Sequence, residues 1–328
     1  MIGMAFEANP AWPRITLLTP SLNAERYITE AVATIARQQY PNLEHIVIDG
    51  GSLDTTLDIL ARHPSIVVAS QRDKGSHDAM NKGLRLATGD IIGFINSDDL
   101  YGPGVLADVA QAFASDTSLD VVVLGTVLFA GASGSELRLV EAHGHFTEQG
   151  FWLPELVFGA PGFNGRFFRR RVFEQIGDFD LRYFISADRQ FLIRLALART
   201  KSRTLPTFGY YYRQHVASAT LNPRHRNRDS ISREHLRQAL EFARQSSATS
   251  AQRSIFLCWH ALEGGKLIWR ALLSGKPREI TATALALFRD DLLWPWRLFR
   301  ALRMRNQIQA LDRTTAAELG ATSQVQPL

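Results

Sequence analysis

The first 130 residues alternate between short apolar runs and segments whose apolar residues recur at helical spacing. Apolar runs predict five strands, at 15–19, 45–49, 66–70, 90–95 and 119–129. The segments between them predict four helices, at 24–38, 52–62, 76–87 and 103–114. In the first of these helices Ile28, Val32 and Ile35 lie on one face. Continuous apolar strands joined by helices are typical of an α/β fold with a mostly parallel sheet covered by helices on both faces.

The rest of the chain is less regular and then becomes helical. No clear period is present over 131–161, and helices are predicted at 168–176 and 187–198. Residues 230–313 are mostly helical, with breaks at 275–277 and at Pro295, and the last dozen residues are expected to fray. We therefore expect an α/β domain over 1–225, made of halves at about 13–130 and 131–225, followed by a helical extension over 226–328.

Three of the predicted strands end in polar clusters. These clusters are Thr19-Pro-Ser-Leu-Asn23, Asp49-Gly-Gly-Ser-Leu-Asp54 and Asn96-Ser-Asp-Asp99. Ligands of parallel α/β sheets bind beyond the carboxyl ends of the strands. We therefore expect the three clusters to converge on one cleft.

Asp98 and Asp99 follow a buried strand directly. Adjacent carboxylates in such a place repel each other and lose hydration, so they persist where a cation or hydrogen-bond donors compensate. Mg²⁺ and Mn²⁺ accept carboxylate and phosphate oxygens together, which suggests a metal held against a diphosphate. The alternative is a turn in which one of these aspartates caps the next helix.

The turn after Asp49 contains two glycines, which allow a tight bend and close approach of a ligand to the backbone. Neither the dinucleotide-binding glycine pattern nor the P-loop pattern is present, so neither of those phosphate sites is expected. Asp49 has the chemistry to accept a hydrogen bond from a base N–H, and Ser52 to cap the following helix. A plain strand-to-helix turn explains this segment equally well.

Three further segments carry candidate site residues. In 73–83, Asp78, Asn81 and Lys82 share neighbouring faces of a helix start, where Lys82 and the helix N-terminus favour phosphate. Asp188, at the start of another helix, is either a general base or a helix cap. His215 is either a metal or phosphate contact or a structural histidine.

Charge is distributed unevenly along the chain. The net charge of +5 combines −6 over residues 1–200 with +11 over 201–328. The acidic part suits a cation. The basic part suits membrane lipid, a phosphorylated acceptor, nucleic acid or an ordinary solvated helix surface. A single cysteine, Cys258, excludes an internal disulfide framework, and no signal segment is recognised, so a cytoplasmic location is expected. We predict no nucleic-acid partner and no particular oligomeric state.

Taken in order over about residues 13–220, these motifs resemble the family-2 inverting glycosyltransferases with the GT-A fold. The resemblance rests on the three strand-end clusters, on Asp73-Lys-Gly75 with Asp78-Ala-Met-Asn-Lys-Gly83, and on an acceptor-side half. That half comprises Phe167-Phe-Arg-Arg170, Gly177-Asp-Phe-Asp180 and Ala187-Asp188. Two positions depart from the family pattern: Gly50 stands where many members carry a second aspartate, and Ala187 where many carry glutamate.

The resemblance implies a nucleotide-sugar site, a metal site and a catalytic base. The implied donor-binding residues are Thr19, Pro20, Asn23, Asp49, Ser52, Asp73, Lys74, Asp78, Asn81, Lys82 and Asp98. Asp99, with His215, is expected to meet Mn²⁺ or Mg²⁺, while Asp98 contacts the ribose. Asp188 would remove a proton from an acceptor hydroxyl, whose oxygen would attack the anomeric carbon opposite the diphosphate and invert its configuration.

The implied partners are a UDP- or GDP-linked sugar and a saccharide or lipid-linked acceptor, as in surface polysaccharide or glycolipid synthesis. Two other functions share parts of this pattern. A sugar nucleotidyltransferase normally has a basic glycine loop after the first strand, which Thr19-Pro-Ser-Leu-Asn23 does not provide. A non-catalytic nucleotide-sugar-binding module would need no base.

Residues 254–305 combine apolar helix faces with tryptophans and a series of arginines. Four of the six tryptophans lie here, and Arg297, Arg300, Arg303 and Arg305 follow them. Trp favours the lipid interface and arginine favours anionic head groups, which suggests peripheral binding to an anionic membrane surface. Asp290 and Asp291 interrupt the apolar run, so we expect no membrane span. The alternative is that the apolar faces pack on the catalytic domain or on a second copy.

Overall fold

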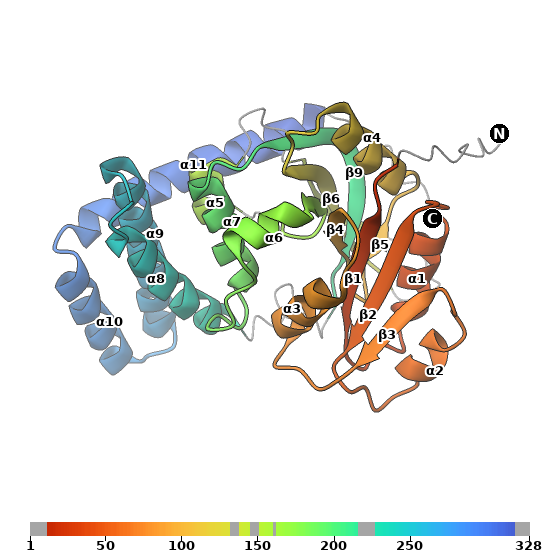
Figure 1. Cartoon of the computed structure of the whole chain (residues 1–328). Coiled ribbons are helices and arrows are strands. Elements are labelled where there is room, and N and C mark those ends of the chain that lie inside the picture. Colours follow the sequence, from red (N-terminus) through yellow and green to blue (C-terminus); the bar gives the residue numbers. More distant parts are fainter. Residues whose placement is uncertain (1–11, 132–137, 145–150, 160–161, 216–226, 319–328) are drawn as a thin grey trace.

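The computed structural model of the chain describes residues 12–131, 138–144, 151–159, 162–215 and 227–318. Its centre is a nine-stranded sheet in the order β3-β2-β1-β4-β8-β6-β9-β5, with β7 paired to β6 (Figure 1). The strands are β1 (Ile15–Ser21), β2 (Leu43–Asp49), β3 (Ile66–Ser70), β4 (Ile91–Phe94), β5 (Leu100–Tyr101), β6 (Val121–Ala130), β7 (Arg138–His143), β8 (Arg166–Arg169) and β9 (Ser202–Arg213). Strands β3, β2, β1 and β4 are parallel neighbours, whereas β8 runs antiparallel between β4 and β6.

Seven helices belong to the first 200 residues and four to the C-terminal part of the described chain. The first group is α1 (Ile28–Ala36), α2 (Thr56–Leu60), α3 (Ser76–Leu86), α4 (Val105–Ser115), α5 (Leu153–Phe158), α6 (Arg170–Ile176) and α7 (Ala187–Leu197). The second group is α8 (Arg228–Arg244), α9 (Ser250–Leu273), α10 (Pro277–Asp290) and α11 (Trp294–Glu318).

Both faces of the sheet are covered, as the continuous apolar strands predicted. Successive strand residues enter opposite hydrophobic clusters: Leu17 and Ile91 pack with α1 and α4, whereas Leu18 and Ile92 pack with α3, α6 and α7. Because side chains alternate between the faces of a strand, this division requires helices on each side. The expected α/β fold with a mostly parallel sheet is confirmed.

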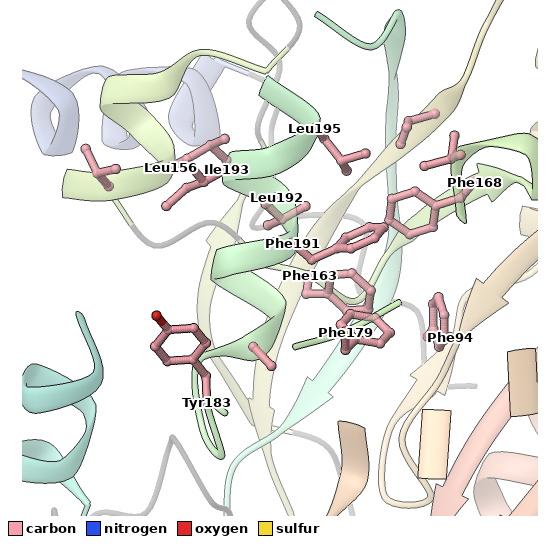
Figure 2. Close-up of a cluster of buried hydrophobic side chains, with 14 of the residues drawn as sticks. Phe94, Leu156, Phe163, Phe168, Phe179, Tyr183, Phe191, Leu192, Ile193 and Leu195 are labelled. Carbon is pink, nitrogen blue, oxygen red and sulfur yellow. The ribbon is translucent and has the colours of Figure 1, made fainter. Parts of the chain in front are cut away.

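The larger cluster is built around stacked and edge-to-face phenylalanines (Figure 2). Phe191 of α7 contacts Phe168 of β8, Phe173 of α6 and Phe179, with ring centroids 5.0–5.8 Å apart. Such pairs contribute roughly 0.5–1.5 kcal/mol beyond the area that they bury. The cluster fixes α7, which carries Asp188, against the sheet.

The C-terminal helices share this core instead of forming their own. Phe242 of α8, Trp259 of α9 and Ala301 of α11 belong to the same buried cluster as Phe191. Two consecutive glycines of α9 accept the neighbouring helices: a Cβ on Gly264 would lie 2.5 Å from Leu287 of α10, and one on Gly265 would lie 3.0 Å from Leu298 of α11. The hydrophobic core is thus continuous from the sheet into α8, α9 and α11, and the domain boundary at residue 225 stays a prediction.

Several elements differ from the sequence-based expectation. Residues 166–169 form strand β8, and the helix expected at 168 starts at Arg170. The reason is that Phe167 and Phe168 pair with β4 and β6 and point to opposite faces of the sheet. Strand β9 was not expected because Pro206 and exposed residues interrupt its apolar pattern. The segment without a clear period contains β7 and α5.

Candidate functional site

The polar clusters after β1 and β2 are joined directly by hydrogen bonds. Gly50 N donates to Ser21 O (2.8 Å), Asn23 N donates to Ser52 Oγ (2.8 Å) and Leu53 N donates to Asn23 Oδ1 (2.9 Å). Asn23 has a left-handed backbone (φ 49°), which asparagine tolerates better than most residues. The two loops therefore form one unit at the carboxyl edge of the sheet, as the sequence predicted.

Asp49 is buried and holds its own turn together. Its carboxylate accepts hydrogen bonds from Gly51 N and Ser52 N (both 3.0 Å), from Ser70 Oγ (2.7 Å) and from Ser52 Oγ. Burial alone would raise the pKa of Asp49, but these hydrogen bonds outweigh it and lower the pKa. The role in base recognition stays a prediction, since the carboxylate already has four protein donors.

The departure from the family pattern at Gly50 has a spatial explanation. A Cβ on Gly50 would lie 2.6 Å from Oδ2 of Asp73, so the carboxylate of Asp73 occupies the space beside this glycine. Oδ1 of Asp73 accepts the amide of Gly75 (2.9 Å), whose φ of 118° favours glycine. The loop after β3 is thereby placed beside the loop after β2.

The first turns of α3 contain the next expected donor-binding residues. Lys82 Nζ donates to Arg72 O (2.7 Å) and lies 3.3 Å from the carboxylate of Asp78. Asp78 also accepts the amide of Lys74 (3.0 Å), while the Lys74 side chain is exposed. Burial would raise the pKa of Asp78, but the Lys74 amide and Lys82 lower it. Lys74 is thus the lysine of this loop that reaches solvent.

Three expected donor-binding side chains point into the protein. The Thr19 hydroxyl lies 3.0 Å from Nε2 of buried His45, and Pro20 is buried within β1. Asn81 uses both ends of its amide on Phe179, donating to its carbonyl (2.9 Å) and accepting its amide (3.0 Å). These side chains pack in the protein interior beneath the site. Any ligand contact by the β1 residues would therefore be through their backbone.

Asp99 occupies a fully buried position. Its Oδ2 accepts the hydroxyl of Tyr210 (2.6 Å) and the amide of Asn96 (2.9 Å), and its Oδ1 accepts the backbone N–H of Arg213 (2.8 Å). Burial, and then the charge of Asp98, raise the pKa of Asp99 well above its ordinary value. The expectation that Asp99 meets a metal does not fit this geometry, because its oxygens are enclosed by protein donors.

Asp98 has the accessibility that Asp99 lacks. Its carboxylate is 24% exposed and lies 2.7 Å from Nε2 of His215, whose ring packs on Tyr27 with centroids 5.1 Å apart. A carboxylate beside an imidazole is a suitable pair of donors for a divalent cation that also binds phosphate oxygens. Among the residues that the structure describes, no cluster of three or more metal-ligating side chains is present.

Strand β9 supplies residues that the sequence reasoning missed. Arg213 is fully buried between the rings of Tyr27 and Phe129, 4.7 and 4.6 Å from their centroids. Its guanidinium donates to Asp98 O (2.9 Å) and to Glu30 (2.5 Å). Arg213, with Tyr210, therefore fixes the turn that presents Asp98. The only sequence signal was the aromatic and basic run Tyr210-Tyr-Tyr-Arg213 before His215.

Asp188 lies in the first turn of α7 and is partly exposed. Ser186, not Asp188, occupies the N-cap position, and the Asp188 carboxylate accepts the amide of Arg189 (2.7 Å). The loop before α7 approaches α3, where His77 Nδ1 lies 3.2 Å from Phe184 O. The exposed ring of Phe184 also lies against Gly75. This loop thus joins the donor-side loop 73–75 to the helix that carries Asp188.

Comparison with known proteins gives this arrangement a function. Residues 16–177 match the model of glycosyl transferase family 2. A PGL/p-HBAD biosynthesis glycosyltransferase of Mycobacterium bovis is 33% identical over 192 residues, which cover 56% of this chain and 70% of that protein. Chondroitin synthase of Escherichia coli is 35% identical over 114 residues, 34% of this chain and 17% of that one.

Solved structures share the fold. TarS residues 1–349 from S. aureus in complex with UDP-GlcNAc superposes with a TM-score of 0.64 at 16% identity, covering 93% of this chain and 92% of that one. The mannosyltransferase PcManGT from Pyrobaculum calidifontis in complex with GDP-Man and Mn²⁺ gives 0.54 at 20% identity, covering 96% and 89%.

The fold and the family match define a glycosyltransferase of the GT-A type that uses a nucleotide-sugar donor. The chain belongs to glycosyl transferase family 2. This membership decides among the three activities considered from the sequence, and the nucleotidyltransferase and the non-catalytic module are set aside. No helix among the described residues is long and apolar enough to cross a membrane.

The buried position of Asp99 predicts a pH-dependent stability difference. A raised pKa means that the folded state binds this proton more tightly than the unfolded state, so the stabilisation is lost as pH rises above about 3.8, the ordinary Asp value. Asn at this position does not titrate. We expect the free energy of unfolding of Asp99→Asn, relative to wild type, to increase between pH 4.5 and 7.5. Urea unfolding in chelator measures it, and a pH-independent difference would contradict the assignment.

Proposed function

We propose that this glycosyltransferase works by a single inverting displacement in which Asp188 is the general base. The observation that carries the proposal is the partly exposed Asp188 carboxylate on the first turn of α7, with the loop before it packed on the donor-side segment through Phe184, Gly75 and His77. Asp188 takes the proton of an acceptor hydroxyl, and that oxygen attacks the anomeric carbon as the diphosphate leaves. A carboxylate within reach of the proton suffices for this role.

We further propose that a divalent cation, Mn²⁺ or Mg²⁺, is held by Asp98 together with His215. Support comes from the exposure of Asp98 and its 2.7 Å approach to His215, in contrast to the enclosed Asp99. Bound beside the diphosphate, the cation supplies charge stabilisation to the leaving group. Arg213 and Tyr210 hold the turn, and Asn23 and the exposed Lys74 are the donor-side side chains best placed to reach a nucleotide sugar.

Substitution of Asp188 separates chemistry from binding. Asp188→Asn keeps the size of the side chain but cannot take the proton, so we expect donor affinity to be retained and transfer to fall about 10²–10⁴-fold. Calorimetric titration with the nucleotide and a radiolabelled-donor assay measure the two effects. Asp58→Asn, at an exposed carboxylate on α2, is the matched control and should transfer normally. Loss of donor affinity or fold in Asp188→Asn would contradict the catalytic assignment.

The metal assignment predicts a loss of transfer in excess chelator and its recovery with Mn²⁺ or Mg²⁺. Asp98→Asn should lower turnover by about 100-fold or more, as expected for removing a charge-stabilising element. The free cation concentration that gives half-maximal activity should rise in the same variant, as measured by titrating activity against free metal. Full turnover of wild type in chelator, or an unchanged metal requirement in Asp98→Asn, would overturn it.

The donor is proposed to be UDP- or GDP-linked and the acceptor to be a saccharide or lipid-linked hydroxyl compound. Fold neighbours hold UDP-GlcNAc in TarS and GDP-Man with Mn²⁺ in PcManGT, and a curated relative acts in PGL/p-HBAD biosynthesis. Surface polysaccharide or glycolipid synthesis is the proposed process. A turnover screen with labelled UDP- and GDP-sugars tests the donor.

An apolar corner where α10 meets α11 supports a lipid-linked acceptor. Phe256, Trp259 and Leu262 are core residues, so the packing alternative holds for this part of α9. At the C-terminal end of the helix, Trp269, Leu272 and Leu273 are exposed. The corner, by contrast, is exposed, with Leu292 at 79% and Phe299 at 67%. We define the apolar corner as Leu285, Phe288, Leu292, Leu293, Trp296 and Phe299. Large exposed apolar patches mark interaction sites.

We propose that the apolar corner docks on an anionic membrane surface. Arg278, Arg289 and Arg303 are exposed basic residues of α10 and α11, whereas Lys276 pairs with Glu279, and Asp290 and Asp291 pair with arginines. A twofold contact between two copies would bring the same arginines together, because such interfaces are self-complementary. Tryptophan and leucine side chains enter the membrane–water interface readily, and neighbouring arginines bind anionic lipid head groups. The apolar corner combines both features.

Flotation with liposomes tests this docking. The full chain should float with anionic vesicles at low salt and much less with neutral vesicles. The combined substitutions Leu292→Gln, Trp296→Gln and Phe299→Gln should abolish flotation. Leu53→Gln, at an exposed leucine outside the C-terminal helices, should not. Failure of wild type to float, or a dimer in sedimentation that the triple variant dissociates, would overturn the membrane assignment.

A further inference from the structure

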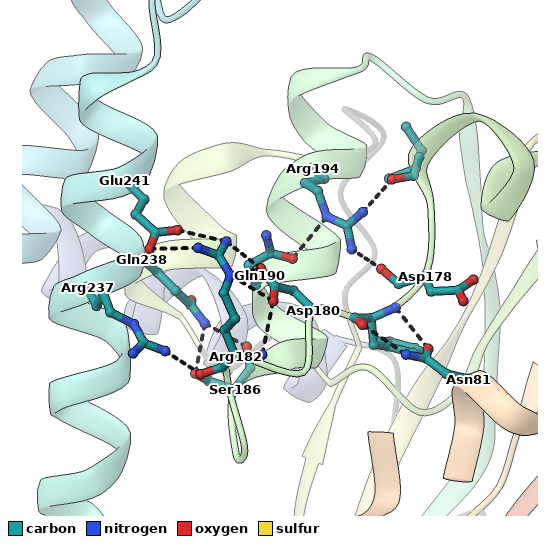
Figure 3. Close-up of polar contacts among 12 residues, drawn as sticks. Asn81, Asp178, Asp180, Arg182, Ser186, Gln190, Arg194, Arg237, Gln238 and Glu241 are labelled. Carbon is teal, nitrogen blue, oxygen red and sulfur yellow. Dashed lines mark hydrogen bonds and ion pairs between the residues drawn. The ribbon is translucent and has the colours of Figure 1, made fainter. Parts of the chain in front are cut away.

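We propose that Glu234 of α8 is a positioning residue for catalysis, which holds the loop that places Asp188. The inference rests on the proposed role of Asp188 as the base. Helix α8 lies beyond residues 16–177, the part that matches the family model. The structure nonetheless packs it against the loop 180–186 immediately before α7 (Figure 3).

The carboxylate of Glu234 accepts hydrogen bonds from three successive backbone amides. Its Oε1 accepts Phe184 N (2.8 Å), and its Oε2 accepts Ile185 N (3.1 Å) and Ser186 N (2.9 Å). Oε2 also accepts the hydroxyl of Ser186 (2.7 Å). Successive N–H groups that converge in this way form a concave anion-binding turn, and the anion here is a protein side chain.

The same face of α8 holds the loop at further points. Glu234, Arg237, Gln238 and Glu241 are spaced by three, one and three residues, which places them on one side of a helix. Gln238 Nε2 donates to both the carbonyl and the hydroxyl of Ser186, each at 2.9 Å. Figure 3 shows Arg237 and Glu241 both reaching from α8 to Arg182: Glu241 accepts hydrogen bonds from its guanidinium, and Arg237 donates to its backbone carbonyl.

These contacts matter for Asp188 because the clamped residues are the start of its helix. Ser186 is the N-cap of α7, and Asp188 follows two residues later. The rest of α7 is fixed by Phe191 in the phenylalanine cluster, so the loop is the adjustable side of the Asp188 position. Phe184, held through its amide, lies against Gly75 on the donor side. Glu234 thereby sets the relation between the base and the donor loop.

A purely structural role and a positioning role give different results. Loss of the carboxylate leaves three amides to water or to no partner, and a displacement of about 1 Å in a reacting group costs on the order of 100-fold in rate. A positioning residue lowers kcat while the KM for the donor stays the same. A residue needed only for folding lowers stability, and kcat per folded molecule stays the same.

The experiment compares Glu234→Ala, Glu234→Gln and the control Asp229→Asn in the full chain. Asp229 lies on the same helix, but its half-exposed carboxylate pairs with Arg270 of α9 and not with the loop 180–186, so its loss should change kcat by less than about twofold. We expect Glu234→Ala to lower kcat about 10- to 100-fold with an unchanged donor KM. Glu234→Gln should lie between, because one carbonyl oxygen still accepts the Ser186 groups while its NH₂ opposes the remaining amides.

Hydrogen exchange provides a readout that does not depend on activity. The amides of Phe184, Ile185 and Ser186 should exchange at least about tenfold faster in Glu234→Ala and at the wild-type rate in Asp229→Asn. Unchanged exchange, or kcat within twofold of wild type in Glu234→Ala, would overturn the proposal. If Asp188→Asn transfers sugar normally, the proposed base fails instead, and faster exchange in Glu234→Ala would then show a clamp without the catalytic consequence that we assign to it.

Discussion

The buried guanidinium of Arg213 is the interaction on which the site depends. It lies between the rings of Tyr27 and Phe129 and bonds to Glu30 of α1 and to the carbonyl of Asp98. It therefore joins α1, which follows β1, the turn after β4, and β9, which carries Arg213. A fully buried cation requires compensation, and the Glu30 carboxylate, the carbonyls and the two ring faces provide it. Removing any of these would leave a charge without water in the middle of the site.

The burial of Arg213 also explains why the side chains of the two adjacent aspartates point in different directions. Asp99 turns inward to Tyr210 and to the Arg213 amide, and this leaves Asp98 at the surface with His215. Chain order does not distinguish the two, since each follows the same buried strand. The distinction arises from β9, a strand more than 100 residues later, whose Tyr210 and Arg213 cover one carboxylate and not the other. Long-range packing thus determines which of the two carboxylates is accessible.

The sequence predicted the parts of the fold that have strong local patterns. The five apolar strands and the helices between them follow directly from periodicity, and the convergence of the loops after β1 and β2 follows from parallel topology. Strands β8 and β9 were not predicted because Phe167 and Phe168 fit a helix start as well as a strand, and because Pro206 interrupts β9. Candidate residues such as Asn81 and Thr19 had suitable chemistry, but their side chains face inward, which only tertiary structure decides.

The C-terminal helices show why the family motif alone does not define the working unit. The match ends at residue 177, before Asp188 and before α8. The hydrophobic cluster that holds α7 nevertheless continues through Phe242, Trp259 and Ala301, and the polar face of α8 binds the loop before α7. No sequence pattern marks an acidic residue that accepts hydrogen bonds from three backbone amides. In the sequence, Glu234 looks like an ordinary surface residue of a helix. The position of Asp188, the proposed base, is therefore determined jointly by the sheet, through α7, and by α8. The proposed chemistry thus depends on the same helical region that carries the apolar corner.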